Sequence, residues 1–270
     1  MSRCSTSSAP TPRNSPKLGV VTRDWNAAEY DRLPIPMTRW GEMVLGWLEL
    51  RGDETVLDAG CGTGRVTEAL RARLPRGRVI ALDGSASMIE QARTRLGDDR
   101  VTYLVADLLQ PLPMPGDEPV DAVLSTATFH WVLDHDALFR NIADVMRPGA
   151  QLAAQCGGKG NIASIEAALG AMGESFAGRK LYAGPDETRT RLEAAGFVEV
   201  TTWLHDEPTP LPPEELETYL ATICLGDHVE SMADEERSRF VHEVAGRLPR
   251  PEIDYVRLNI RARRRPSAAE

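Results

Sequence analysis

The stretch from Val56 to Gly64 reads VLDAGCGTG, with three glycines at alternate positions behind an apolar run and an acid. Glycine permits positive φ angles and lets another group approach the backbone closely. The following residues, 64–74, have the apolar spacing of an amphipathic helix. An ordinary strand–helix turn needs only one glycine. The loop therefore indicates a ligand that lies against the backbone, near the free N–H groups at the start of the helix.

Strand and helix signals alternate on both sides of this loop. Apolar runs predict strands at 54–60, 78–84, 101–107, 119–127 and 147–156, with helices at 64–74, 85–96 and 134–146. This alternation is typical of an α/β fold whose parallel sheet is covered on both faces. Further along, the patterns predict helices at 161–178, 186–197, 212–225 and 233–248, and strands at 197–205 and 252–264.

Composition narrows the class of protein. The chain has 270 residues, of which 42% are apolar, and a net charge of −9. The acidic balance argues against a nucleic-acid partner, and no run reaches the ~18 apolar residues that suggest a membrane span. The four cysteines lack the spacing of metal ligands or of a disulfide framework. We therefore expect a cytoplasmic protein without a metal site, either a monomer or a homodimer.

Low-complexity sequence marks the two ends of the chain. Residues 1–22 are rich in Ser, Thr and Pro and predict a disordered tail, and residues 266–270 predict a second one. Between them we expect a single domain, 23–265. Segments that could cover a site are expected at about 23–50, at about 160–190 and at about 207–250.

Three acids mark the ends of predicted strands. Asp58 stands two residues before the first glycine, Asp83 ends the second strand and Asp107 ends the third. The carboxyl ends of parallel strands meet at one edge of the sheet, so these acids predict a negative pocket that suits a nucleoside. Asp83 can accept two ribose hydroxyls, and Asp107 or its backbone can meet an adenine amine. Asp58 would repel a pyrophosphate, and the GxGxG spacing differs from the GxGxxG of nicotinamide sites.

Four segments together resemble the class I S-adenosylmethionine-dependent methyltransferases. They are VLDAGCGTG (56–64), VIALDGSASMIEQAR (79–93), VADLLQPLP (105–113) and DAVLSTATFHWVLD (121–134). The resemblance covers residues from about 25 to about 263. It implies a doubly wound, Rossmann-like sheet of seven strands with the last strand antiparallel, helical lid insertions and S-adenosyl-L-methionine as cofactor.

The same resemblance implies a set of cofactor-binding residues. The glycines would admit the methionyl part, while Asp83 would bind the ribose and Asp107 would lie near the adenine. Met88 would either pack on the adenine or belong to the helix core. The full set is Asp58, Gly60, Cys61, Gly62, Gly64, Asp83, Gly84, Met88, Asp107 and Leu108.

Within this superfamily the chain is most similar to trans-aconitate methyltransferase-like proteins. The similar segments are DWNAAEYDR (24–32), FHWVLDHDALF (129–139) and the helical stretch 216–248. Trp25, Tyr30 and His130 are the candidate substrate-binding residues, although Trp25 and Tyr30 could equally pack within a leading helix. His130 is also the catalytic candidate, as an orienting group or as a base, and it stands where that family often has glutamine. Trp131 is expected in the core.

These observations predict an enzyme that methylates a small organic molecule, with the oxygen of a carboxylate or hydroxyl favoured as acceptor. Two other classes stay open: an NAD-dependent oxidoreductase and a non-catalytic nucleoside-binding module. The sequence leaves the acceptor itself open, together with the choice among O-, N- and C-methylation.

Overall fold

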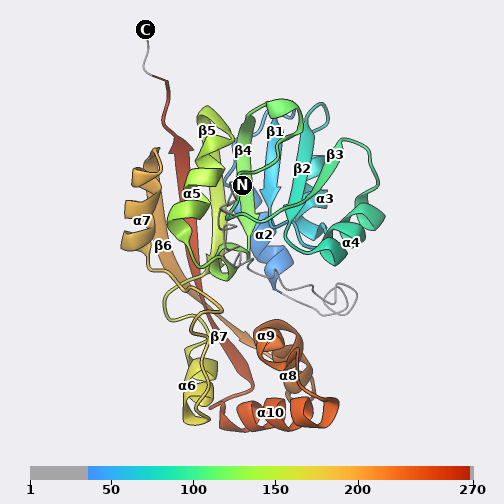
Figure 1. Ribbon diagram of the computed structural model, residues 1–270, viewed down its shortest axis with the longest axis vertical. Helices are drawn as coiled ribbons and strands as arrows, with labels where there is room; N and C mark the ends of the chain where they lie inside the picture. The colour runs from blue at the N-terminus through green and yellow to red at the C-terminus, as the bar shows by residue number, and fades with distance from the viewer. Residues whose placement is uncertain (1–35, 268–270) are drawn as a thin grey trace, which may run out of the picture.

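The computed structural model describes residues 36–267, which build one seven-stranded sheet with helices around it (Figure 1). The strand order is β3-β2-β1-β4-β5-β7-β6, and β7 runs antiparallel to both of its neighbours. This confirms the predicted Rossmann-like sheet with an antiparallel last strand. The strands are β1 (Thr55–Ala59), β2 (Arg78–Asp83), β3 (Val101–Val105), β4 (Val120–Thr126), β5 (Met146–Gly157), β6 (Phe197–Pro210) and β7 (Glu252–Arg264).

Helices cover both faces of the sheet because successive strand residues enter different cores. In β1, Val56 packs in the core that contains Leu70, whereas Leu57 packs in the core that contains Leu138. The first core lies under α2 (Met37–Leu45), α3 (Arg65–Ala72) and α4 (Ala86–Leu96). The second lies under α5 (His135–Asp144) and α7 (Pro185–Ala194). Strands buried on both faces need continuous apolar runs, as the sequence has.

A separate group of helices gathers around the ends of β6 and β7 that extend beyond the sheet (Figure 1). The group comprises α6 (Ala163–Ala171), α8 (Pro213–Tyr219), the π-helix η3 (Leu220–Cys224), α9 (Gly226–Val229) and α10 (Asp234–Arg247). It has its own apolar core, to which Leu169, Leu216 and Val244 belong. The predicted helix 161–178 is too long, since α6 ends at Ala171 and Gly173 turns the chain with φ +80°.

The site forms where the strands β1 to β4 end, on the side of the sheet that faces this helical group (Figure 1). Two short 3-10 helices, η1 (Pro115–Asp117) and η2 (Phe129–Trp131), flank β4. The predicted tail 1–22 and the candidates Trp25 and Tyr30 lie outside the described residues. Within 36–267, none of the helices has the length and apolar character needed to span a bilayer. The same residues contain no cluster of three or more His, Cys, Asp or Glu suited to a metal ion.

Candidate active site

The three glycines of the loop lack side chains for three different reasons. A Cβ at Gly60 would lie 2.0 Å from Oγ1 of Thr128, so its close neighbour is the chain itself. Gly64 has φ +82°, begins α3, and packs against Ala92 of α4. Gly62 has φ +54°, and apart from its two chain neighbours no atom of the described residues lies within 4 Å of the position of a Cβ. Gly62 is thus the position where the missing side chain leaves room for a ligand.

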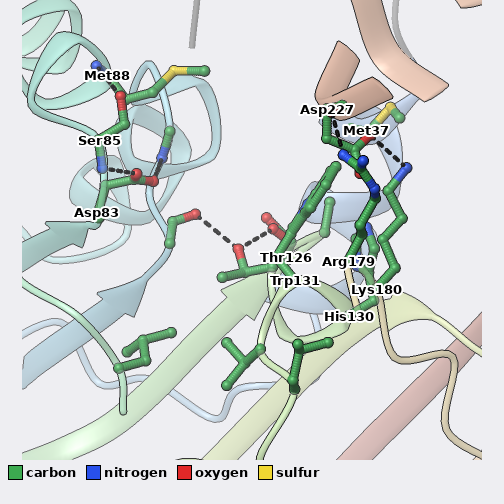
Figure 2. A pocket seen from close by; sticks show the side chains of 18 of the residues that line it. Met37, Asp83, Ser85, Met88, Thr126, His130, Trp131, Arg179, Lys180 and Asp227 are labelled. Atoms are coloured by element: carbon green, nitrogen blue, oxygen red, sulfur yellow. Dashed lines mark hydrogen bonds and ion pairs between the residues drawn. The ribbon is translucent and has the colours of Figure 1, made fainter. Parts of the chain in front are cut away.

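A cavity of about 690 Å³ runs from this loop toward the helical group. Figure 2 shows Asp83, Ser85 and Met88 on one side of it and His130 and Lys180 on the other. We name the first side the nucleoside side; it contains Gly60, Gly62, Asp83, Gly84, Ser85, Met88, Asp107, Leu108 and Leu109. We name the second side the acceptor side; it contains His130, Trp131, Arg179, Lys180, Tyr182, Asp227, Tyr255 and Arg257.

Asp83 ties the nucleoside side together. It is the last residue of β2, and its two carboxylate oxygens accept backbone hydrogen bonds from Gly62 and Ser85, both at 2.9 Å. Burial raises the pKa of Asp83, while these backbone N–H groups oppose the shift. A carboxylate oxygen has capacity for more than one hydrogen bond. Asp83 can therefore hold the glycine loop in place and still accept from a ligand hydroxyl.

The next strand contributes the rest of the nucleoside side. Asp107 lies two residues beyond β3, and its Oδ1 accepts a hydrogen bond from the backbone N–H of Leu109 at 2.9 Å. Gly84, Met88 and Leu108 line the same cavity, with Met88 in the first turn of α4. The structure thus brings seven of the ten predicted cofactor-binding residues to one wall: Gly60, Gly62, Asp83, Gly84, Met88, Asp107 and Leu108.

Asp58, Cys61 and Gly64 do not belong to the cavity wall. The side chain of Asp58 is buried within the sheet, where the hydroxyl of Thr67 donates to its Oδ2 at 2.7 Å. Its Oδ1 has no hydrogen-bond partner in residues 36–267. Burial raises the pKa of Asp58 to about 7, and the charge of Asp83 adds to the shift. Burial likewise raises the pKa of the Cys61 thiol, which argues against a nucleophile.

His130 is buried on the acceptor side, just after β4. The backbone N–H of Gly157 donates to its Nδ1 at 3.4 Å, and its ring stacks on Tyr182 with centroids 5.9 Å apart. Burial lowers the pKa of His130 well below the usual value, and the charges of Arg257 and Lys180 lower it further. At neutral pH the imidazole is therefore uncharged, with Nδ1 as acceptor and the proton on Nε2.

Lys180 and Asp227 form a charged pair beside His130 (Figure 2). Lys180 Nζ lies 3.5 Å from an oxygen of Asp227, donates to the carbonyl of Cys224 at 2.6 Å and sits 4.7 Å from the ring centroid of Trp131. Burial opposes ionisation of Asp227, but His228, whose Nδ1 lies 3.7 Å from Oδ1 of Asp227, and the charge of Lys180 bring the pKa of Asp227 to about 2. Trp131 is thus on the cavity wall and not in the core as expected, because its ring covers the lysine ammonium.

Sequence reasoning missed the cations of the acceptor side, Arg179, Lys180 and Arg257. Arg179 and Lys180 lie in a segment without apolar periodicity, which offered no signal. Arg257 is different, because it interrupts the apolar pattern of β7 together with Asn259, and both side chains are buried. A charged residue within an apolar strand pattern could have indicated Arg257 as a candidate, since charged side chains are rarely buried without a partner.

Comparison with known proteins agrees with this geometry. Residues 56–149 match the model of a methyltransferase domain. The chain is 36% identical over 132 residues to trans-aconitate 2-methyltransferase of Paracidovorax citrulli, covering 49% of this chain and 50% of the relative. It is 34% identical over 182 residues to the protein of that name from Methylobacterium nodulans, covering 67% of each. Phosphoethanolamine N-methyltransferase 2 of Haemonchus contortus shares the fold, with a TM-score of 0.59 and 19% identity over 85% of this chain and 53% of that chain.

The sheet order, the glycine loop and the strand-end acids define a class I S-adenosylmethionine-dependent methyltransferase. The chain belongs to the family of the trans-aconitate 2-methyltransferases within that class. It spans about half the length of several of the curated relatives that it matches. The cofactor of the family is S-adenosyl-L-methionine, which fits the open space at Gly62 and the carboxylate of Asp83 on the cavity wall.

Proposed function

We propose that this chain transfers a methyl group from S-adenosylmethionine to a carboxylate oxygen of a small organic acid. The observation that carries the proposal is the make-up of the cavity. Its nucleoside side has acids at the strand ends, whereas its acceptor side has three cations, Arg179, Lys180 and Arg257, against two carboxylates, Asp227 and Glu230, around the neutral His130. A cationic wall favours an anionic acceptor. The relatives named trans-aconitate 2-methyltransferase act, by that name, on such an acid.

The residues of the nucleoside side would hold the cofactor. Asp83 would accept from the ribose, Asp107 would lie at the adenine, and Gly62 would leave room for the methionyl part. When bound, S-adenosylmethionine would supply a methyl group carried on a sulfonium. An oxyanion that attacks this methyl carbon in line forms the new C–O bond as the C–S bond breaks, and S-adenosylhomocysteine is the leaving group. The protein then has to position two reactants and keep water out, and positioning alone can lower a barrier by ~7–11 kcal/mol.

A carboxylate acceptor needs no base. Its pKa lies near ~4, so it is ionised at neutral pH. His130 is suited to orient it, because the neutral ring keeps a proton on Nε2 while Nδ1 is occupied by the N–H of Gly157. A protonated Nε2 donates a hydrogen bond and cannot take up a proton there. A hydroxyl acceptor, by contrast, would need a base.

The variant His130→Gln tests this role. Glutamine can still donate a hydrogen bond but cannot titrate, so we expect turnover at saturating S-adenosylmethionine to fall by no more than about ten-fold. The wild-type rate should show no titration of His130 near neutral pH, because burial holds the pKa of this residue well below its usual value. The measurement is the rate against pH for both proteins.

A surface histidine provides the control. His242 is exposed and paired with Glu217, so His242→Gln should leave the rate profile unchanged. A thousand-fold loss in His130→Gln, together with the loss of a titration near neutral pH, would make His130 a base. Such a result would replace the carboxylate acceptor by a hydroxyl.

The proposal itself is tested by turnover. The purified protein is incubated with S-adenosylmethionine and, separately, with acetate, succinate, citrate and trans-aconitate, and products are sought by mass spectrometry. We expect at least one acid to gain the mass of one CH2 group. Calorimetry with S-adenosylhomocysteine and with NAD runs alongside and should show binding of the first alone. Binding of S-adenosylhomocysteine without methylation of any acid would contradict the acceptor class, and binding of NAD would contradict the reaction.

A further inference from the structure

Arg257 is a buried cation without an anionic partner among residues 36–267. Only 2% of the residue is exposed, and it lies in the middle of β7 on the acceptor side of the cavity. Its Nε donates to Oε1 of Gln155 at 3.3 Å, while its Nη2 has no hydrogen-bond partner among residues 36–267. In that part of the chain no carboxylate forms an ion pair with it. Burying an unpaired charge is costly, so a counter-ion that is not among residues 36–267 is expected, and the adjoining cavity is where a ligand could supply it.

The groups that hold the guanidinium are neutral. Its central carbon lies 4.6 Å from the ring centroid of Trp40 and 5.9 Å from that of Tyr255. These aromatic faces attract a cation, yet they do not use its N–H groups. Lys180 differs, because Asp227 of the same chain already accompanies it. Within the part of the chain that the structure describes, Arg257 is therefore the buried cation of the acceptor side that lacks an anion.

A directed chain of hydrogen bonds fixes which atom of Gln155 faces Arg257. Gln155 Nε2 donates to Oδ1 of Asn259 at 2.9 Å, and Asn259 Nδ2 donates to Nδ1 of His205 at 2.8 Å. His205 Nε2 in turn lies 3.4 Å from a carboxylate oxygen of Glu207. Along this chain the amide oxygens of Gln155 and Asn259 accept from the preceding group on the Arg257 side, and their nitrogens donate to the next group on the Glu207 side. The chain orients the guanidinium without neutralising it.

We propose that Arg257 is the counter-ion that binds a carboxylate of the acceptor, and that Gln155 is the residue that positions it. The inference rests on the proposed function, and it makes Arg257 the side chain by which the protein selects an acid as the methyl acceptor. A planar guanidinium presents several N–H groups in fixed directions and matches a carboxylate. A carboxylate at position 155 would form an ion pair with Arg257 inside the protein. The neutral amide of Gln155 instead leaves the positive charge of Arg257 available to the ligand.

The first test is Arg257→Met, which removes the charge and keeps an apolar side chain of similar length. The acid is the one of acetate, succinate, citrate and trans-aconitate that the wild-type protein methylates best. We expect its KM to rise about 30-fold or more, with the affinity for S-adenosylhomocysteine unchanged within about two-fold. The melting temperature should not fall, because replacing a buried unpaired charge by an apolar side chain is neutral or stabilising. The matched control is Arg261→Met, at an exposed position of the same strand.

The second test keeps the arginine. Gln155→Glu places a carboxylate at the atom that now bonds to Nε, so the acid should bind about ten-fold more weakly or worse. A purely structural Arg257 predicts the reverse: a lower melting temperature in Arg257→Met and an unchanged KM in both variants. Either unchanged KM would overturn the inference. If the wild-type protein binds S-adenosylhomocysteine but methylates no acid, both the proposed function and this inference are wrong. If the wild-type protein methylates an acid and the two variants have the same KM as the wild type, only the inference is wrong.

Discussion

Replacing Asp83 by alanine should weaken the binding of S-adenosylmethionine about ten- to a hundred-fold. The carboxylate accepts from the backbone of both Gly62 and Ser85 and faces the nucleoside side of the cavity. The variant loses the acceptor for the ribose and the tie that holds the glycine loop. A hydrogen bond to a charged group contributes ~1.5–3 kcal/mol, which gives this range. Calorimetry with S-adenosylhomocysteine measures the loss.

Two further variants separate binding from folding. Asp83→Asn keeps one acceptor oxygen and the size of the side chain, so its affinity should lie between those of the wild type and Asp83→Ala. Asp98→Ala removes an exposed carboxylate paired with Arg93 before β3 and should change nothing. Unchanged affinity in Asp83→Ala would remove Asp83 from the cofactor site.

Substituting Gly60 should instead destabilise the fold. An alanine Cβ would lie 2.0 Å from Oγ1 of Thr128, at a φ of +85°. The hydroxyl of Thr128 would have to leave the carbonyls of Gly60 and Thr126, to which it donates at 3.2 and 3.0 Å. A left-handed conformation and overpacking together cost about 2–5 kcal/mol. We expect Gly60→Ala to lower the melting temperature by roughly 5–15 °C.

Gly62→Ala is the matched comparison, two residues further along the same loop. Its Cβ would meet no atom of residues 36–267 within 4 Å, so only the left-handed conformation at φ +54° opposes it, at about 1–2 kcal/mol. The melting temperature should therefore fall less than in Gly60→Ala. The methyl group would instead occupy ligand space and reduce the affinity for S-adenosylhomocysteine by about ten-fold or more. Unchanged affinity for S-adenosylhomocysteine in Gly62→Ala would show that Gly62 does not face the ligand.

The sheet and its nucleoside side could be predicted because their signals are local. The apolar runs that form β1 to β5 are continuous, and the glycine loop with Asp83 and Asp107 follows directly from strand ends. The π-helix η3 could not be predicted, because it depends on packing within the helical group. The early end of α6 did have a local signal, Gly173, which turns the chain with φ +80°. The local sequence pattern also led us to expect that all three glycines of the loop make room for a ligand. Gly60 instead makes room for Thr128, a residue far from it in sequence.

Most of the acceptor side could not be predicted, because contacts between residues far apart in sequence bring its side chains together. Arg257 reaches the cavity because β7 is inserted antiparallel between β5 and β6, and its partner Gln155 belongs to β5. Lys180 is held by groups from the distant segment 224–227. His130 was found from its place after β4, but the tautomer of its ring depends on the N–H of Gly157 and its uncharged state depends on burial.

The chemical nature of the product tests the central claim most directly. The protein is incubated with S-adenosylmethionine labelled with tritium in the methyl group and with the acid that it methylates best, and the product is then treated with alkali. An ester of a carboxylate hydrolyses and releases the label as volatile methanol, whereas a methyl ether, amine or carbon-bound methyl group retains it. We predict that alkali releases the label. A labelled product that keeps its tritium through the treatment would contradict methyl transfer to a carboxylate.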